Sequence, residues 1–135
     1  MAKEFIYEDK ITSEYLDIYG HVNNAKYLVL YEKARWAMFK PFGITTETVK
    51  DQAEGPIITE LTLKFRRELK EGDEIKIFTK FIGLKNSLIF NVEQRIQIGE
   101  KQIASEAKYD FAIMDMNKRK LKKVDDKWLS LFGQD

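Results

Sequence analysis

The chain has 135 residues, of which 44% are hydrophobic and 33% charged, with 23 Lys and Arg against 22 Asp and Glu. This length suits a single domain, residues 1–135, that buries its own core. The net charge of +1 excludes a globally basic nucleic-acid-binding protein. The chain has no cysteine, which excludes disulfides and thiolate metal sites, and its single histidine, His21, excludes a multi-histidine metal site.

The N-terminal residues alternate charged and apolar side chains and contain no apolar stretch as long as that of a signal peptide. No run in the chain approaches the roughly 18 apolar residues that span a bilayer. We therefore expect a cytoplasmic protein without a membrane partner.

A long, strongly apolar helix is predicted near the N-terminus. Residues 5–11 alternate in a strand pattern and residues 12–23 form a polar loop. From Asn24 to about Lys40 there is no proline or glycine, and apolar residues recur at helical spacing. One broad face of this helix consists of Tyr27, Leu28, Tyr31, Ala34, Arg35 and Met38. Most of its remaining surface is also apolar and consists of Val29, Leu30, Trp36, Ala37 and Phe39. A helix that is apolar on most sides should be enclosed by protein on most sides.

Beyond a polar stretch that ends at Gly55, the hydrophobic period becomes two. Ile57, Thr59, Leu61, Leu63 and Phe65 are expected to face one way, and further strands follow around residues 75–81, 88–98 and 103–113. Four alternating strands with short connections predict an antiparallel meander with one packed face. The basic tail after residue 115 should end in a short helix that includes Trp128 and Phe132.

The predicted order is strand, helix and four strands. Because a sheet must bury its apolar face, and the sequence offers one long helix for this, we expect an α+β protein. Its five-stranded antiparallel sheet would wrap around the central helix, as in the hotdog fold, with a short C-terminal helix. Exposed sheet edges are normally paired or covered, so we also expect a homodimer or homotetramer.

A dense motif spans residues 17–35. Its positions are Asp17, Gly20, His21, Val22, Asn23, Asn24, Tyr27, Leu28, Glu32, Ala34 and Arg35. The pattern D-x-x-G-H-V-N-N-x-x-Y-L-x-x-x-E-x-A-R resembles the signature of the 4-hydroxybenzoyl-CoA thioesterase family of hotdog proteins. The resemblance implies hydrolysis of an acyl-CoA, or less often of an acyl-acyl carrier protein, without a cofactor. The acyl group would be fatty or aromatic.

The same residues suit this chemistry on physical grounds. A thioester has a good leaving group, so its hydrolysis needs an activated water or a carboxylate nucleophile and a stabilised oxyanion. Asp17 supplies a carboxylate, and Gly20 lets the loop turn back toward the start of the helix. Asn23 and Asn24 are N-capping residue types, and the helix start offers unpaired N–H groups to an oxyanion. His21, beside it, is either a structural hydrogen-bonding residue or a direct participant.

Further candidates concern substrate binding. Arg66, Arg67 and the basic tail are candidate contacts for the phosphates of CoA, although such a tail is also typical of a solvated surface. Tyr27 fits either the core or an acyl pocket, and Ser87 either a turn or a contact with the pantetheine arm.

The helix also carries Glu32 and Arg35, which stand one turn apart and are expected to form a local ion pair.

Two other functions remain open. A hotdog hydratase or dehydratase would need a paired acid and base, for which His21 with Asp17 or Glu32 is a candidate. A non-catalytic module would bind acyl-CoA without turning it over.

Overall fold

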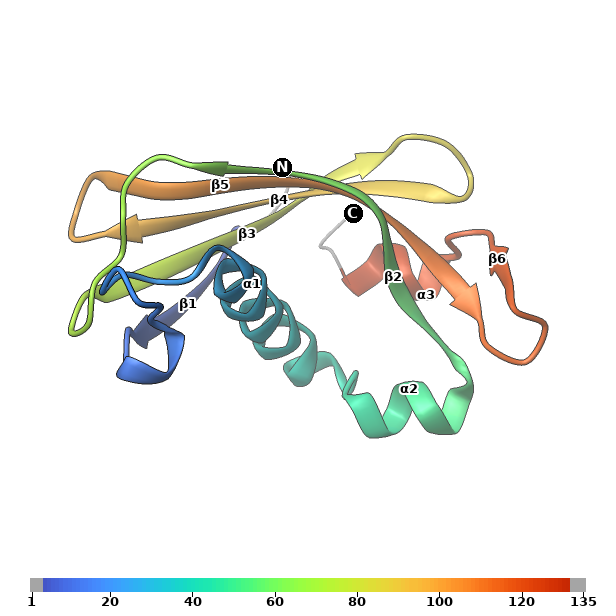
Figure 1. Cartoon of the computed structure of the whole chain (residues 1–135). Coiled ribbons are helices and arrows are strands. Elements are labelled where there is room, and N and C mark those ends of the chain that lie inside the picture. The colour runs from blue at the N-terminus through green and yellow to red at the C-terminus, as the bar shows by residue number, and fades with distance from the viewer. Residues whose placement is uncertain (1–3, 132–135) are drawn as a thin grey trace.

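The computed structural model describes residues 4–131. A curved antiparallel sheet arches over one long helix, α1 (Asn24–Phe39), so the predicted α+β arrangement is confirmed (Figure 1). The strands are β1 (Glu4–Lys10), β2 (Glu54–Phe65), β3 (Glu74–Leu84), β4 (Ile89–Ile98), β5 (Gln102–Asp115) and the short β6 (Lys120–Lys122). The sheet thus has six strands, one more than expected, because β6 folds back on the end of β5.

Strand β2 does not continue into a hairpin. The strand order across the sheet is β1-β3-β4-β5-β2, so β2 pairs with β5 and the predicted meander holds only for β3, β4 and β5. Residues 66–73 carry the chain across the end of the sheet, over three strand spacings of about 4.8 Å each. Leu69, in the middle of this connection, is fully buried and anchors it.

A bulge in β2 changes which side chains face the helix. The register shifts between the pairs Ile58–Phe111 and Glu60–Asp110, which leaves Thr59 as the extra residue. An extra residue moves the alternation by one position, so Ile58 shares the face of Leu61. The predicted grouping of Ile57 and Thr59 with that face is therefore wrong.

Two more helices complete the fold. Helix α2 (Thr46–Gln52) was not predicted, because its sequence is polar; it forms behind a capping box in which Thr45 and Thr48 bond each other's backbone N–H. Helix α3 (Asp126–Leu131) confirms the predicted C-terminal helix, of which Phe132 lies outside the described residues. No helix within residues 4–131 is long and apolar enough to cross a membrane.

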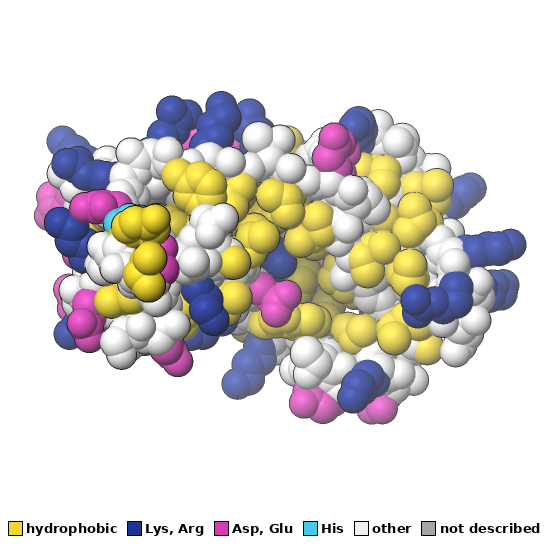
Figure 2. Space-filling model, viewed as in Figure 1, with side chains coloured by type: hydrophobic (Ala, Val, Ile, Leu, Met, Phe, Trp, Pro, Cys, Tyr) yellow, Lys and Arg dark blue, Asp and Glu magenta, His cyan; other side chains and the backbone are white. Residues whose placement is uncertain are grey.

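Helix α1 is covered on one side only. It packs mainly against β1 and β3, and its buried residues include Tyr27, Tyr31 and Arg35. Leu28 and Val29 are 37% and 43% exposed, so the expectation that protein encloses most of the helix is wrong for the single chain. One sheet cannot cover both sides of a helix, and Figure 2 shows the resulting surface as largely hydrophobic.

Glu54, the first residue of β2, holds the C-terminal segment against the sheet. Its carboxylate accepts hydrogen bonds from Lys122 Nζ and from Trp128 Nε1, each at 2.9 Å, and Trp128 is fully buried. Burial alone raises the pKa of Glu54, but the hydrogen bonds from Lys122 and Trp128 outweigh this effect and lower the pKa below its usual range.

Replacing Glu54 with Gln should lower the free energy of unfolding by about 1–3 kcal/mol at neutral pH, because a charged acceptor is lost. A lowered folded-state pKa adds stability above the unfolded-state value of about 4.3, and this stability disappears as the pH falls through the folded-state value. Circular dichroism melts from about pH 3 to pH 7 should therefore show a smaller acid-induced loss in Glu54→Gln than in the wild type. Glu71→Gln, at an exposed position, is the control. Identical acid losses in Glu54→Gln and the wild type would contradict this role.

Candidate active site

A cavity of about 380 Å³ lies beside the start of α1. The loop before α1 contributes Asp17, Tyr19, His21 and Val22, α1 contributes Asn24 and Tyr27, and the end of β2 with its following loop contributes Phe65, Arg66, Arg67 and Glu68. Six of the nine predicted site residues therefore line one cavity, although they come from two distant parts of the sequence.

The loop that carries Asp17 is a tight turn. Asp17 Oδ1 accepts the Tyr19 N–H at 2.8 Å, and the Gly20 N–H donates to the Asp17 carbonyl at 3.1 Å. Gly20 has a φ of 80°, a backbone conformation that strongly favours glycine. The second carboxylate oxygen of Asp17 has no hydrogen-bond partner within residues 4–131. The turn therefore orients the carboxylate and leaves one oxygen free.

The start of α1 presents a free N–H group. Asn23 is the N-cap, and its side chain accepts the Ala25 N–H at 2.9 Å, while the Lys26 N–H donates to the Asn23 carbonyl at 2.9 Å. In the described part of the chain the N–H of Asn24, the first helical residue, donates to no acceptor. Of the two predicted capping residues, Asn23 caps the helix and Asn24 leaves its N–H available.

The two arginines are placed by strand β5. The backbone N–H groups of Arg66 and Arg67 both donate to the carbonyl of Ala104, at 2.8 Å and 3.0 Å. Ala104 is the extra residue of a bulge in β5, where the register shifts against β4. The Arg66 side chain also lies 3.5 Å from Glu106. Arg66 and Arg67 thus line the same cavity as the loop of Asp17.

His21 lies between these two walls. Its ring stacks on Tyr19 with centroids 5.9 Å apart, and its Nε2 is 3.9 Å from Glu68 Oε2. The Asp17 N–H donates to the His21 carbonyl at 3.1 Å, but among the described residues the His21 ring makes no hydrogen bond to the Asp17 carboxylate. Its closest acid is therefore Glu68 rather than Asp17.

Tyr27 and Phe65 form the apolar part of the cavity. Their rings meet edge to face at 5.0 Å, and the Tyr27 hydroxyl donates to the Arg67 carbonyl at 3.5 Å. Burial raises the pKa of Tyr27, which keeps its hydroxyl protonated as a donor. Tyr27 is therefore both a core residue and a cavity residue, so the two readings are not exclusive.

The other predicted site residues lie outside the cavity lining. Gly20 and Asn23 shape the turn and the cap next to it. Ser87 lies in the turn after β3, whereas residues 66–73 precede β3, so the two loops are at opposite ends of this strand (Figure 1). Within one chain Ser87 therefore does not contact this cavity, because the length of β3 separates the two.

Sequence reasoning missed Tyr19, Val22, Phe65 and Glu68 as lining residues, although Val22 belongs to the motif. Tyr19 is an exposed aromatic residue inside the motif, and Glu68 is an acidic residue directly after two arginines. Both residues could have been recognised as candidates from their positions in the sequence. Phe65 gave no signal, since it continues the alternation of a strand.

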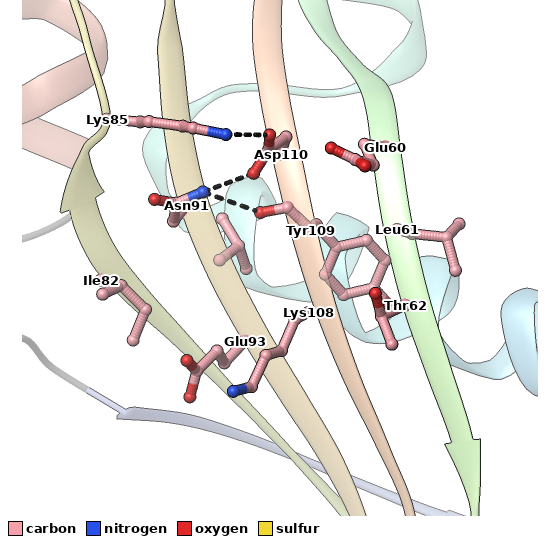
Figure 3. A pocket seen from close by; sticks show the side chains of 11 residues that line it. Glu60, Leu61, Thr62, Ile82, Lys85, Asn91, Glu93, Lys108, Tyr109 and Asp110 are labelled. Atoms are coloured by element: carbon pink, nitrogen blue, oxygen red, sulfur yellow. Dashed lines mark hydrogen bonds and ion pairs between the residues drawn. The ribbon is translucent and has the colours of Figure 1, made fainter.

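A second cavity, of about 360 Å³, lies on the outer face of the sheet and contains none of the predicted site residues (Figure 3). Asp110 accepts hydrogen bonds from Lys85 Nζ at 3.1 Å and Asn91 Nδ2 at 2.6 Å. The Asp110 carboxylate of this cavity is thus held by Lys85 and Asn91. Within residues 4–131 no three His, Asp or Glu side chains are grouped so that they would hold a metal ion.

Two curated proteins are similar in sequence. The chain is 31% identical over 83 residues to the acyl-acyl carrier protein thioesterase ATL3 of Arabidopsis thaliana, over 62% of this chain and 44% of the relative. It is 27% identical over 77 residues to the betainyl-CoA thioesterase of Pseudomonas aeruginosa, over 57% of this chain and 48% of the relative. The matched segments thus span about half the length of each relative.

Several solved structures share the fold. A 1,4-dihydroxy-2-naphthoyl-CoA thioesterase from Synechocystis superposes with a TM-score of 0.86 at 14% identity, covering 98% of this chain and 97% of its own. A hypothetical protein from Staphylococcus aureus in complex with CoA has a TM-score of 0.85 at 14% identity, covering 98% and 84%. A probable thioesterase from Escherichia coli has a TM-score of 0.81 at 22% identity, covering 96% and 99%.

These neighbours confirm the predicted hotdog fold. Residues 11–132 match the family model of the thioesterase-like superfamily, which is nearly the whole chain. The protein therefore belongs to the thioesterase-like superfamily.

Proposed function

We propose that this protein is a thioester hydrolase that cleaves an acyl-CoA, and that it belongs to the 4-hydroxybenzoyl-CoA thioesterase family within its superfamily. One observation carries the proposal: the carboxylate of Asp17 and the free N–H of Asn24 line the same cavity. A base or nucleophile and an oxyanion donor are the two groups that thioester hydrolysis requires.

Asp17 is the group that begins the reaction. Its Oδ1 is held by the Tyr19 N–H, which leaves the other oxygen to remove a proton from water or to attack the thioester carbonyl. In either route the carbonyl oxygen becomes an oxyanion and the CoA thiolate leaves. A thiol pKa of about 8.5 makes this leaving group a good one without a strong general acid.

The N–H of Asn24 is the proposed oxyanion donor. It stands at the positive end of the α1 dipole, and helix-terminal N–H groups stabilise negative charge. Loss of one such donor typically costs about 10²–10³ in rate.

The remaining walls are proposed to hold the substrate. Arg66 and Arg67 suit the phosphates of CoA, since guanidinium groups bind phosphate with two parallel hydrogen bonds. The structural neighbour from Staphylococcus aureus was solved with CoA, which supports a CoA ligand. Tyr27 would contact the fatty or aromatic acyl group, and Gly20 and Asn23 would shape its entrance.

A panel of fatty and aromatic acyl-CoAs with a thiol-trapping dye tests the reaction class. Release of free thiol supports the hydrolase. A change in enoyl absorbance without thiol would indicate a hydratase, and binding without either signal would indicate a non-catalytic module.

Asp17→Asn should lower thiol release by at least about 10²-fold, since general-base catalysis contributes about 10²–10⁴. The amide keeps an oxygen for the Tyr19 N–H, so the turn should persist, but it neither accepts the proton nor attacks the carbonyl. Steady-state kinetics of folded protein measure the effect. Asp51→Asn, in an exposed position on α2, is the matched control with wild-type activity. An Asp17→Asn enzyme with more than about a tenth of wild-type activity would rule out this assignment.

Asn24→Pro tests the oxyanion donor, because it deletes the N–H at a position where no helical bond is lost. Proline is favoured at the first helical residue, and Asn23, with φ −62° and ψ 142°, already has the extended backbone that precedes proline. We expect a fall in kcat of about 10²-fold or more for Asn24→Pro and near wild-type turnover for Asn24→Ala. Circular dichroism verifies the fold of both. If the two variants were equally active, the donor would have to be another group, with His21 the first candidate.

We also propose a homodimer, in which β2 pairs with β2 of a second copy. Strand β2 is hydrogen-bonded to β5 on one side and to no described strand on the other. On this strand the apolar side chains of Ile58 and Phe65 are exposed, at 37% and 53%. An exposed long edge with apolar neighbours is a template for strand pairing. A homotetramer would be a dimer of such dimers.

Analytical ultracentrifugation at micromolar concentration should show a dimer or tetramer. Ile58→Glu should shift it toward monomer, because a charge would be buried in the contact. Ile6→Glu, an equally apolar-to-acidic change on the exposed face of the opposite edge strand, should leave the dimer intact. A wild-type monomer at this concentration would refute the proposal.

A further inference from the structure

A groove runs along α1 away from the cavity of Asp17. Its helix wall carries Asn24, Leu28 and Arg35, which share one stripe of α1. Because α1 packs mainly against β1 and β3, it leaves the side of the sheet near Leu61–Phe65 of β2 uncovered. Figure 2 shows this face as largely hydrophobic and hollowed beside the helix.

The opposite wall of this α1–β2 groove comes from β2. Leu61, Leu63 and Phe65 pair with Tyr109, Ala107 and Ser105 of β5, and paired residues of an antiparallel sheet point to the same face. That face is the one that contacts α1, since Tyr31 on the helix donates to Ser105 at 2.8 Å. The groove is therefore apolar along its length and begins at Phe65, in the wall of the cavity.

The far end of the groove is polar. The Arg35 guanidinium lies 5.1 Å from the ring of Tyr109 and 5.4 Å from that of Phe111, and Arg35 is 8% exposed. Arg35 Nη1 donates to Gln94 Oε1 at 3.1 Å. Arg35 and Asn24 are separated by about 16 Å along the helix axis, at 1.5 Å per residue. This span suits a medium or long acyl chain that starts at the helix N-terminus.

The polar groups closest to Arg35 already have other hydrogen-bond partners. Gln94 Nε2 donates to the Tyr31 carbonyl at 3.2 Å and to Thr79 Oγ1 at 2.8 Å. The hydroxyl of Tyr31 is bonded to Ser105. The Tyr109 hydroxyl, in contrast, is buried beside the Arg35 guanidinium and donates its proton to no acceptor in the described chain, and Tyr109 is only 2% exposed.

Arg35 also lacks a counter-charge. Among residues 4–131 no Asp or Glu lies within ion-pair distance of its guanidinium. The predicted local ion pair with Glu32 is therefore wrong, because Arg35 turns inward to Gln94 while Glu32 is exposed. Buried charges are normally paired, and buried hydroxyls are normally bonded. The unpaired charge of Arg35 and the hydroxyl proton of Tyr109, side by side at the end of an apolar groove, call for an oxygen acceptor.

We propose that Arg35 and Tyr109 bind a second oxygen atom on the acyl group of the substrate, a carboxylate or hydroxyl remote from the thioester carbonyl. The proposal rests on the proposed function and specifies its substrate class. The acyl chain lies in the α1–β2 groove, with its thioester at Asn24 and its far oxygen at Arg35.

Matched substrates test this directly. Decanoyl-CoA, ω-hydroxydecanoyl-CoA and the mono-CoA thioester of sebacic acid differ only at the end of the chain, and the corresponding lauroyl series covers a longer reach. We expect kcat/KM to be at least about tenfold higher for an oxygen-bearing member than for the alkyl member of at least one series, as for a hydrogen bond to a charged group. A preference for the dicarboxylic member alone identifies a carboxylate, and a preference for both oxygen-bearing members identifies any acceptor oxygen.

Arg35→Met should abolish this preference, so kcat/KM should fall at least about tenfold more for the oxygen-bearing substrate than for the alkyl substrate, because only the former loses a charge-assisted bond. Arg95→Met is the matched control. Arg95 also stacks on an aromatic ring, that of Phe78 at 4.0 Å, but it lies on the outer face of the sheet. The Arg95→Met protein should prefer the oxygen-bearing substrate over the alkyl substrate as strongly as the wild type does.

Tyr109→Phe keeps the test valid if Arg35→Met fails to fold. It removes a hydroxyl that donates its proton to no acceptor in the described chain, so the melting temperature should not fall. The preference for the oxygen-bearing substrate should decrease several-fold, by about the worth of one neutral hydrogen bond.

Two outcomes would overturn the inference. One is a wild type that does not distinguish the members of either series. The other is an Arg35→Met protein that loses all substrates equally or changes only its sedimentation, which would show that Arg35 pairs with a carboxylate of a second copy.

Titration calorimetry with methyl decanoate and monomethyl sebacate, whose ester replaces the thioester, separates this inference from the proposed function, since binding needs no turnover. Tighter binding of monomethyl sebacate, lost in Arg35→Met, supports the site even if no acyl-CoA releases thiol. Thiol release with no preference for an oxygen would refute this inference alone.

Discussion

The cavity depends on one backbone hydrogen bond, from the Val22 N–H to the Leu69 carbonyl at 2.8 Å. Val22 ends the loop that carries Asp17, and Leu69 lies in the connection that carries Arg66 and Arg67. Both side chains are buried in the core, so the bond is shielded from water. This joint fixes the two loops relative to each other, so that Asp17 and the two arginines share a cavity.

A second constraint is geometric. A single sheet covers one side of α1, and the helix lies over the β1 and β3 half of the sheet. The uncovered half leaves β2 with an unpaired edge and leaves the groove between β2 and the helix open. The surface that we propose for pairing and the groove that we propose for the acyl chain have the same cause, which is the off-centre position of the helix.

The polar cluster beneath α1 shows how a core accommodates a charge. Arg35, Gln94 and Tyr31 lie in the middle of an otherwise apolar interior, and their hydrogen bonds join the helix to three strands. Hydrophobic packing alone would hold the helix equally well, since a buried charge is costly. The free-energy cost of burying the Arg35 charge at one end of a groove is better explained by a role in binding than by a role in stability.

The local sequence determined the elements of this protein and much of its candidate site. The strand alternation and the proline-free apolar stretch after Asn24 predicted the α+β hotdog fold, and the motif at residues 17–35 placed Asp17 and Asn24 at one helix start. These features are local, because turns, caps and periodicity depend on neighbours in the chain.

Only the tertiary structure decided the long-range partners. Strand β2 lies against β5 because residues 66–73 span the end of the sheet, and no hydropathy pattern encodes which strand receives it. The bulge at Thr59 reverses the alternation in a sequence that looks regular. Arg35 turns toward Gln94 instead of Glu32, and Ser87 ends far from Asp17, because contacts across a sheet depend on register and not on spacing along the chain.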